Sequence, residues 1–155
     1  MIWLLYIVAG LLGFVVLLNL IGLALPRDHI AARRAVFDKP PERVWDAMVE
    51  LADDVAKRDK LPIELERDER PRARVSRIID DKLPFGGRWY YELEPVAAGT
   101  RLTITEAGFV KVPMFRIFTT LAPNATKTKF LRELGAKLAV AVEVEPAEPS
   151  VLARR

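Results

Sequence analysis

The sequence predicts an α+β fold in which an antiparallel sheet packs on a C-terminal helix, preceded by one N-terminal transmembrane helix. Three observations carry this prediction. Residues 1–25 contain no charged side chain. A series of short runs in the middle of the chain alternates apolar and polar residues, which is typical of half-buried strands joined by tight turns. An apolar stripe at helical spacing follows the last of these runs.

The composition excludes several classes of function. The 155 residues contain no cysteine, so disulfides, thiolate metal sites and cysteine nucleophiles are excluded. His29 is the only histidine, which excludes a His-rich metal site, and a Ser-His-Asp triad would have to be built on it. The net charge of +3 comes from 24 basic and 21 acidic residues, too even a balance for a dedicated nucleic-acid binder. We therefore expect no metal, no cofactor and no nucleic-acid partner.

The N-terminal segment, residues 1–25, reads as a membrane anchor. Asn19 is the one strongly polar residue between Ile2 and Leu25. A helix over this run would be roughly 36 Å long, against a hydrocarbon core of about 30 Å. The alternative is a secretory signal peptide, which would show basic residues before an apolar run of about 7–15 residues. Here no Lys or Arg comes first and the run is longer, so we predict a retained anchor with the lipid bilayer as a partner.

The charges beside this segment predict its orientation. Arg27, Arg33 and Arg34 follow the apolar run, and nothing basic precedes it. Basic residues beside a span favour the cytoplasmic side, so the N-terminus would lie outside and the C-terminal domain in the cytoplasm. We expect a single-pass membrane protein.

The domain over residues 26–143 begins with a strand and a helix. From His29 to Phe37 the residues can alternate, with Ile30, Ala32 and Val36 on one side. Prolines and an acid in "KPPERVW" suit a first helical turn. An apolar stripe then continues for about four turns. Its members are Val44, Trp45, Met48, Leu51, Ala52 and Val55.

Strands fill the middle of the domain. Ile63 and Leu65 alternate with charged residues, and a second alternating run covers residues 72–80. In residues 87–95, one face carries Trp89, Tyr91 and Leu93. After a turn around Gly99, residues 100–108 place Leu102 and Ile104 on one face. These runs predict an antiparallel meander.

A closing helix follows from Asn124, and its stripe predicts that Leu134 is a core residue. The stripe consists of Phe130, Leu131, Leu134, Leu138, Ala141 and Val142. Residues 144–155 combine prolines with charge, so we expect a disordered tail there.

Several of these segments together resemble the START/SRPBCC superfamily, and most closely its membrane-anchored, polyketide-cyclase-like members. The resemblance lies in "PPERVW", "LPFGGRWYYELEP", "GTRLTITEAGFVKVPMFRIF" and "TKFLRELGAKL", and covers most of residues 26–139. It implies a helix-grip fold, in which a curved sheet wraps around the C-terminal helix and leaves a cavity that binds lipids, sterols or polyketides. This chain departs from the pattern because only about 25 residues separate Lys57 from Leu83. We therefore expect a domain truncated in its middle strands, with a sheet that lacks a strand or two, and a cavity that is small, open or absent.

The stretch "DKLPFGGRWYYELEP" is the candidate ligand-binding region. Gly86 and Gly87 would let the chain bend sharply into the aromatic strand. The aromatic side chains are then either ordinary core or the wall of a pocket, and both interpretations stay open. Under the second, the predicted ligand-binding residues are Phe85, Trp89, Tyr91, Leu93, Leu102, Ile104 and Leu134.

Glu106 is the one candidate for acid or base chemistry. It shares strand parity with Leu102 and Ile104, so it would face inward, where burial raises the pKa of a carboxyl. The more common role is an ion pair, for which Arg116 and Arg88 are candidates.

We therefore predict a membrane-anchored module that binds an apolar or amphipathic small molecule. One alternative is a cyclase- or dehydratase-type enzyme, but that needs titratable groups that converge inside the domain. The sequence offers only Glu106, Tyr91 and an arginine for that purpose, so it favours a protein without catalytic activity. The other alternative is a partner-binding membrane protein without a cavity.

Overall fold

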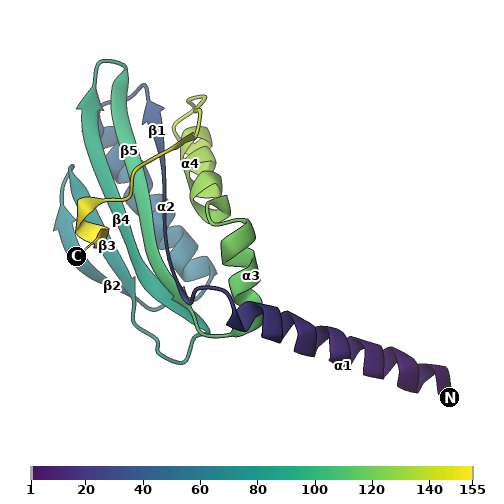
Figure 1. The fold of residues 1–155 in the computed structure, drawn as a ribbon. Helices are drawn as coiled ribbons and strands as arrows, with labels where there is room; N and C mark the ends of the chain where they lie inside the picture. The colour runs from purple at the N-terminus through teal and green to yellow at the C-terminus, as the bar shows by residue number, and fades with distance from the viewer. Residues whose placement is uncertain (1, 155) are drawn as a thin grey trace.

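The computed structural model of the protein describes residues 2–154 and has the predicted α+β architecture (Figure 1). In chain order its elements are α1 (Ile2–Leu23), β1 (Asp28–Phe37), α2 (Pro41–Arg58), β2 (Ile63–Glu69), β3 (Ala73–Ile78), β4 (Phe85–Val96), β5 (Gly99–Val110), α3 (Pro113–Leu121), α4 (Ala125–Lys137), β6 (Glu145–Pro146) and a 3₁₀ turn (Val151–Arg154). The helix α3 was not expected, because the sequence pattern predicted a helix only from Asn124 onward.

The six strands form one antiparallel sheet in the order β2-β3-β4-β5-β1-β6. The two longest strands, β4 and β5, pair along their whole length and meet in a tight turn at Gly99. Gly99 has a φ of +123°, and a Cβ there would lie 2.1 Å from the carbonyl oxygen of Phe37. Only glycine suits this turn. The short region between Lys57 and Leu83 supplies β2 and β3, so it contributes two strands to the sheet.

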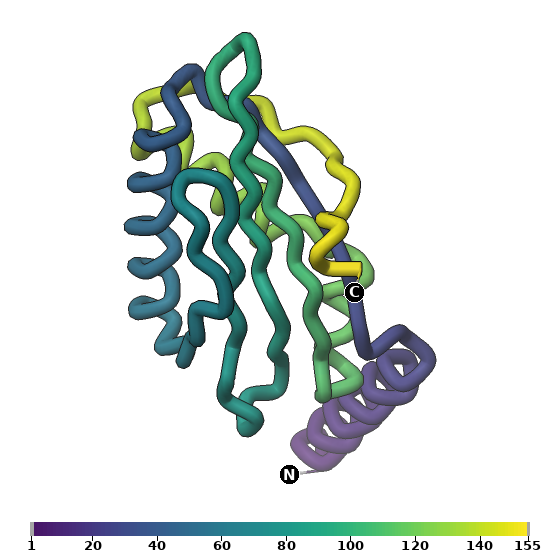
Figure 2. Tube along the Cα trace, turned by 90° about the vertical axis from the view of Figure 1, so that its left-hand side faces the viewer, coloured from purple at the N-terminus to yellow at the C-terminus, as the bar shows by residue number. Residues whose placement is uncertain are grey.

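The helices α2 and α4 cover one face of the sheet and enclose the core between them and the strands (Figures 1 and 2). Buried residues at the heart of this core come from every layer: Phe37, Val44, Trp45, Met48, Leu93, Leu102, Ile104, Phe130, Leu131 and Leu134. Leu134 is fully buried, as its place in the apolar stripe of α4 predicts.

The inner face of β1 is the one opposite to the predicted apolar side. Ile30, Ala32 and Val36 do share a side, but the core contains Ala35 and Phe37 of the other parity. The register explains this, because Ala35 pairs with Leu102, whose side chain points toward the helices. His29 has the same parity as Ala35 and therefore also faces inward.

The C-terminal segment lies along the outer face of the sheet, where the sequence predicted a disordered tail. In Figure 2 it crosses this face as the yellow tube. The short strand β6 pairs with Arg33 and Arg34 of β1, and the backbone N–H of Ser150 donates to Thr105 Oγ1 at 3.0 Å. Thr105 is almost completely buried as a result. The segment covers part of a sheet face that would otherwise meet water.

Helix α1 projects away from the domain and is exposed along nearly all of its length. It is long and apolar enough to cross a membrane, and it is the one such helix in residues 2–154. Its last turn packs against the start of α3. A Cβ at Gly22 would lie 2.0 Å from the carbonyl oxygen of Pro113, so the two backbones touch there.

Candidate ligand-binding pocket

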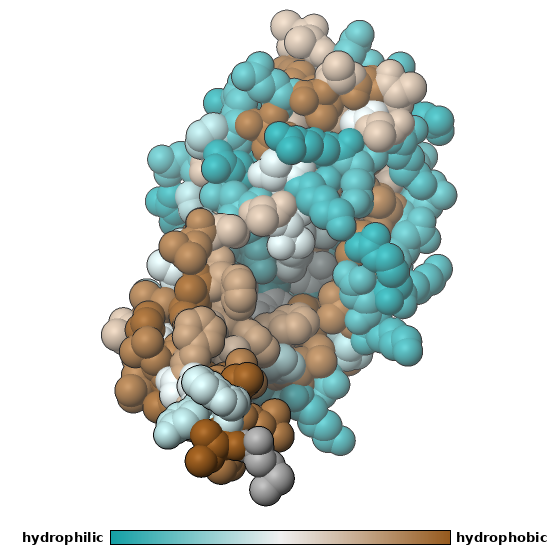
Figure 3. Space-filling model, turned by 90° about the vertical axis from the view of Figure 1, so that its right-hand side faces the viewer, coloured by the Kyte–Doolittle hydropathy of each residue, from teal (hydrophilic) through white to brown (hydrophobic). Residues whose placement is uncertain are grey.

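A cavity of about 570 Å³ lies between the sheet, the end of α2 and helix α3. It occupies the half of the domain nearest α1, and it opens between α2 and α3 on the face shown in Figure 3. Apolar side chains dominate its wall. They include Val55, Leu61, Ile63, Ile78, Phe85, Trp89, Phe109, Phe115 and Phe118.

Small residues make room for this cavity. Two of the residues that α2 contributes to the wall are alanines, Ala52 and Ala56. On the inner face of the sheet, the paired positions Gly87 and Gly108 carry no side chain. Gly87 has a φ of +142°, and a Cβ there would lie 2.4 Å from the carbonyl oxygen of Ala107. Of the two glycines, Gly87 is therefore the one whose backbone conformation requires glycine, and it lies between Phe85 and Trp89 on the inner face of β4.

An aromatic wall runs along β4 from the mouth of the pocket to the core. Phe85 and Trp89 line the cavity and are only partly buried, and Tyr91 closes its inner end. The ring centroids of Trp89 and Tyr91 are 6.2 Å apart, and those of Tyr91 and Phe130 are 5.7 Å apart. Burial raises the pKa of the Tyr91 hydroxyl, so this group stays protonated and remains a hydrogen-bond donor.

The wall also has polar residues, which are His29, Asp59, Ser76, Arg77, Glu106, Thr119 and Thr126. Two of them, His29 and Glu106, form a cluster with Lys127 of α4. Lys127 Nζ donates to Glu106 Oε2 at 2.6 Å and to the carbonyl oxygen of Pro123 at 2.7 Å. His29 Nε2 lies 3.5 Å from the other carboxylate oxygen, Oε1. The Lys127 side chain is completely buried, whereas those of His29 and Glu106 are 18% and 21% exposed. Of this cluster, His29 and Glu106 therefore reach the pocket.

The electrostatics of the cluster keep Glu106 ionised. Burial alone raises the pKa of this carboxyl, but the hydrogen bond from His29 and the charge and hydrogen bond of Lys127 outweigh burial. The pKa of Glu106 consequently lies below its ordinary value, opposite to the predicted direction. The Lys127 ammonium also lies 6.0 Å from the centroid of the Trp89 ring, within the range of a cation–π contact.

The predicted arginine partners of Glu106 were wrong. Arg88 pairs with Glu66 at 2.7 Å, because its side chain lies on the strand face opposite to Trp89. Arg116 donates to the backbone carbonyls of Val110 and Lys111. A signal for Lys127 was present in the sequence: it precedes Leu131 and Leu134 by four and seven residues, so it lies on the buried stripe of α4.

The predicted ligand-binding residues fall into two groups. Phe85, Trp89 and Tyr91 line the cavity. The other four are Leu93, Leu102, Ile104 and Leu134, and they lie in the packed core beyond its inner end. Leu93, Leu102 and Ile104 face the helices as predicted, and Leu134 of α4 packs in the same core, which leaves no space for a ligand there.

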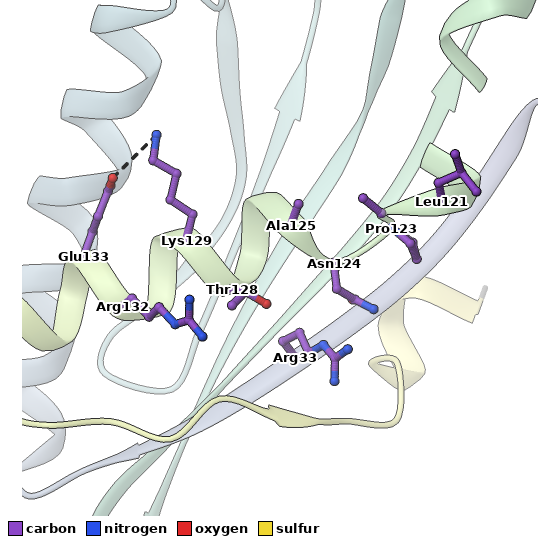
Figure 4. A pocket seen from close by; sticks show the side chains of 10 residues that line it. Arg33, Leu121, Pro123, Asn124, Ala125, Thr128, Lys129, Arg132 and Glu133 are labelled. Carbon is purple, nitrogen blue, oxygen red and sulfur yellow. Dashed lines mark ion pairs between the residues drawn. The ribbon is translucent and has the colours of Figure 1, made fainter. Parts of the chain in front are cut away.

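A second, larger groove of about 670 Å³ lies on the surface of the domain, between β1 and the first turns of α4 (Figure 4). It is open to solvent and bordered by charged side chains, including Arg33 and Arg132. The one ion pair drawn there joins Lys129 to Glu133 at 3.7 Å. The inner pocket has the enclosure and the apolar wall that small-molecule sites usually show, so it is the candidate site. Within residues 2–154, no cluster of three or more His, Asp or Glu side chains is arranged to hold a metal ion.

Comparison with known proteins shows likeness at the level of structure. No family model and no curated protein matches the sequence. A conserved protein from Geobacillus kaustophilus superposes with a TM-score of 0.55 at 13% identity, over 74% of this chain and 98% of that one. The Aha1 dimer from Colwellia psychrerythraea gives 0.54 at 14% identity, covering 71% and 96%. The protein SSP2350 from Staphylococcus saprophyticus gives 0.53 at 17%, covering 80% and 99%.

These neighbours are helix-grip-like proteins, and at such low identity they establish the fold alone. The element order, the antiparallel sheet and the closing helix α4 agree with that fold. They match about three quarters of this chain and nearly all of their own length. Beyond its N-terminal apolar helix, the chain therefore has the helix-grip fold.

Proposed function

We propose that the protein is a membrane-anchored module that binds an apolar or amphipathic small molecule in the pocket beside Trp89. One observation carries this proposal: a cavity of about 570 Å³ with a mostly apolar wall, into which the paired side chains of His29 and Glu106 project among a few other polar groups. Sites for small molecules commonly combine a largely apolar wall with a few convergent polar groups that set orientation. The alternative without a cavity loses its support, because the short region before Leu83 still leaves this space open.

The polar cluster favours a ligand with a hydrogen-bond donor, such as a hydroxyl. Glu106 and Lys127 neutralise each other, and only the carboxylate side of the pair reaches the pocket. An ionised carboxylate can only accept hydrogen bonds, and the carboxylate of a fatty acid has none to donate. A neutral alcohol or phenol with an apolar body therefore fits better than a fatty acid of the same length.

We extend the proposal to the anchor: α1 spans the bilayer, and the domain lies in the cytoplasm. The support is the length of α1, its exposure, and the arginines that follow it. An alkaline phosphatase fused after Arg155 should be inactive in intact cells, because that enzyme needs an oxidising compartment. Strong phosphatase activity would contradict the orientation.

Binding is tested with the full chain, held in an amphipathic polymer so that no bilayer competes for the ligand. Long-chain alcohols and fatty acids of equal length are titrated calorimetrically. We expect saturable binding of the alcohol with a negative heat-capacity change, and weaker binding of the acid. Trp89→Leu removes the aromatic wall and corrects for ligand that partitions into the polymer. Trp45→Phe, in the packed core, is the matched control and should bind as the parent does. Equal signals from the parent and Trp89→Leu would sink the proposal.

A second candidate function is acid–base catalysis of the cyclase or dehydratase type. It is favoured by the convergence of two titratable side chains, because His29 and Glu106 lie 3.5 Å apart at one wall of the pocket. Proton transfer to a bound ligand requires such groups within reach of it. The test is product formation by the full chain that disappears in His29→Gln while alcohol binding persists. Turnover unaffected by His29→Gln would exclude this role.

A further inference from the structure

The pocket opens on the side of the domain from which α1 departs. In Figure 1, α1 leaves from the side that carries the helices, and in Figure 2 it recedes behind the sheet. Figure 3 views that same side and shows a hollow in the middle of the face. Apolar side chains gather in the lower part of this face, where α1 itself projects toward the viewer. The mouth of the pocket and the anchor therefore point in the same direction.

The contact between α1 and α3 fixes the depth of the pocket rim. A 22-residue helix is about 33 Å long, close to the hydrocarbon thickness of a bilayer, so Leu23 falls at the membrane–water interface. Gly22 touches Pro113, the first residue of α3. Helix α3 therefore starts at the interface, and Figure 1 shows that it runs across the direction of α1. If α1 spans the bilayer, α3 lies along its surface.

The side chains of α3 suit that position. Phe118 and Leu121 are 66% and 79% exposed, and Phe115 is 42% exposed. Phe115 and Phe118 also line the pocket, so one apolar surface continues from the cavity over its rim. Such exposure is costly in water and favourable at the acyl boundary of a bilayer.

Basic side chains flank the same end of the domain. Arg27 and Lys111 lie 5.3 Å and 5.9 Å from the ring centroid of Phe109, which also lines the pocket. Arg27 lies four residues after the end of α1 and Lys111 two residues before the start of α3, so both charges sit at headgroup level. Aromatic residues beside cations at this depth favour a bilayer with anionic lipids.

We infer that the face carrying α3 rests on the bilayer, with Phe118 and Leu121 inserted among the lipids, and that the pocket exchanges its ligand directly with the membrane. This inference rests on the proposed binding function. It identifies the ligand as a lipid-soluble molecule and the bilayer as its source. Water-borne ligands would meet the mouth only after displacing the rim from the lipid.

The absence of cysteine allows a direct test in the full chain. Nitroxide labels are placed on Phe118→Cys and Leu121→Cys, and the protein is reconstituted in vesicles of phosphatidylcholine and phosphatidylglycerol. Collision of the label with oxygen reports lipid, and collision with a water-soluble nickel chelate reports water. Leu12→Cys in the middle of α1 is the lipid reference. Ile30→Cys, on the outer face of β1, is the aqueous reference.

We expect labels at 118 and 121 to favour oxygen, as at 12, and the label at 30 to favour nickel. Nickel accessibility at 118 and 121 equal to that at 30 would overturn the inference, and the binding function would still stand if alcohols bind beside Trp89. A nickel-accessible label at 12 would overturn the anchor and this inference with it. Circular dichroism of each labelled variant confirms that the fold is retained.

Discussion

The space between the sheet and the helices has two halves that are built on the same strands. One half is filled by side chains, and the other contains a cavity. In the half near the β4–β5 turn, Leu93, Leu102 and Ile104 meet Leu134 of α4, and all four are buried. In the half near α1, the same strand faces carry Gly87, Trp89, Glu106 and Gly108, and Lys127 at the start of α4 reaches Glu106 while a cavity remains beside Trp89. One half is a solid core, and the other is a pocket of about 570 Å³.

The difference lies in the helix opposite each half. Helix α4 presents Phe130, Leu131 and Leu134 to the strands and fills the gap. Helix α3 instead packs mainly against α1, and its aromatic side chains form a rim rather than a plug. Strand alternation therefore determines which side chains face inward, while the packing partner of the opposing helix determines whether a cavity remains.

The largest loss of stability is expected at the boundary between the two halves, where Glu106 pairs with Lys127. Glu106→Gln leaves a completely buried ammonium without its counter-ion, which should cost about 3–5 kcal/mol of unfolding free energy. Denaturant unfolding measures this. The double variant Glu106→Gln/Lys127→Met removes both charges and should recover much of the loss. Equal stability of the parent and Glu106→Gln would mean that the ion pair does not contribute to the free energy of unfolding.

A substitution in the solid half should be nearly as severe. Leu134→Ala removes a fully buried side chain among Phe130, Leu102 and Ile104, and should cost about 2–5 kcal/mol. Chemical denaturation gives the value. A loss of unfolding free energy below about 1 kcal/mol would show that α4 does not pack tightly on the sheet.

The pair also predicts a dependence of stability on pH. The pKa of Glu106 is lower in the folded protein than its ordinary value, so the pair stabilises the fold fully above that ordinary value. The contribution should fall as the pH drops through the lowered pKa. We expect the stability difference between the parent and Glu106→Gln to shrink on acidification. A difference that grows toward low pH would contradict the assigned shift.

The smallest effect is expected at the pocket rim. Phe118→Ala changes a side chain that is 66% exposed, so unfolding of the protein in detergent should change by no more than about 0.5 kcal/mol. A loss of more than about 2 kcal/mol would place Phe118 in a packed core and remove the contrast with Leu134.

The elements predicted from the sequence were those with strong periodicity. The stripe of α2, the stripe of α4 and the alternation in β4 and β5 each appear in the structure, because single faces are buried there. Helix α3 escaped prediction because it is nine residues long and its apolar residues contact α1 and the pocket rather than one core face. The order of the C-terminal segment was not predicted, because it depends on partners that are distant in the sequence, such as Thr105.

The candidate site was only half predictable for the same reason. Alternation places Trp89, Tyr91 and Glu106 on the inner face, and it places Leu93 and Leu102 there as well. Which of these line a cavity depends on the path of α3 and α4, which no local pattern specifies. The polar cluster combines β1, β5 and α4, so His29 and Lys127 could be related to Glu106 only through the tertiary structure.

The most direct test compares the two halves within one molecule by fluorine NMR. The full chain labelled with 5-fluorotryptophan has three indoles: Trp3 in α1, Trp45 in the solid core and Trp89 on the pocket wall. Titration with a long-chain alcohol should shift the Trp89 resonance saturably and leave that of Trp45 unchanged. A Trp89 resonance that does not respond, or one that moves in parallel with Trp45 without saturation, would contradict the claim that this half of the domain is a binding site.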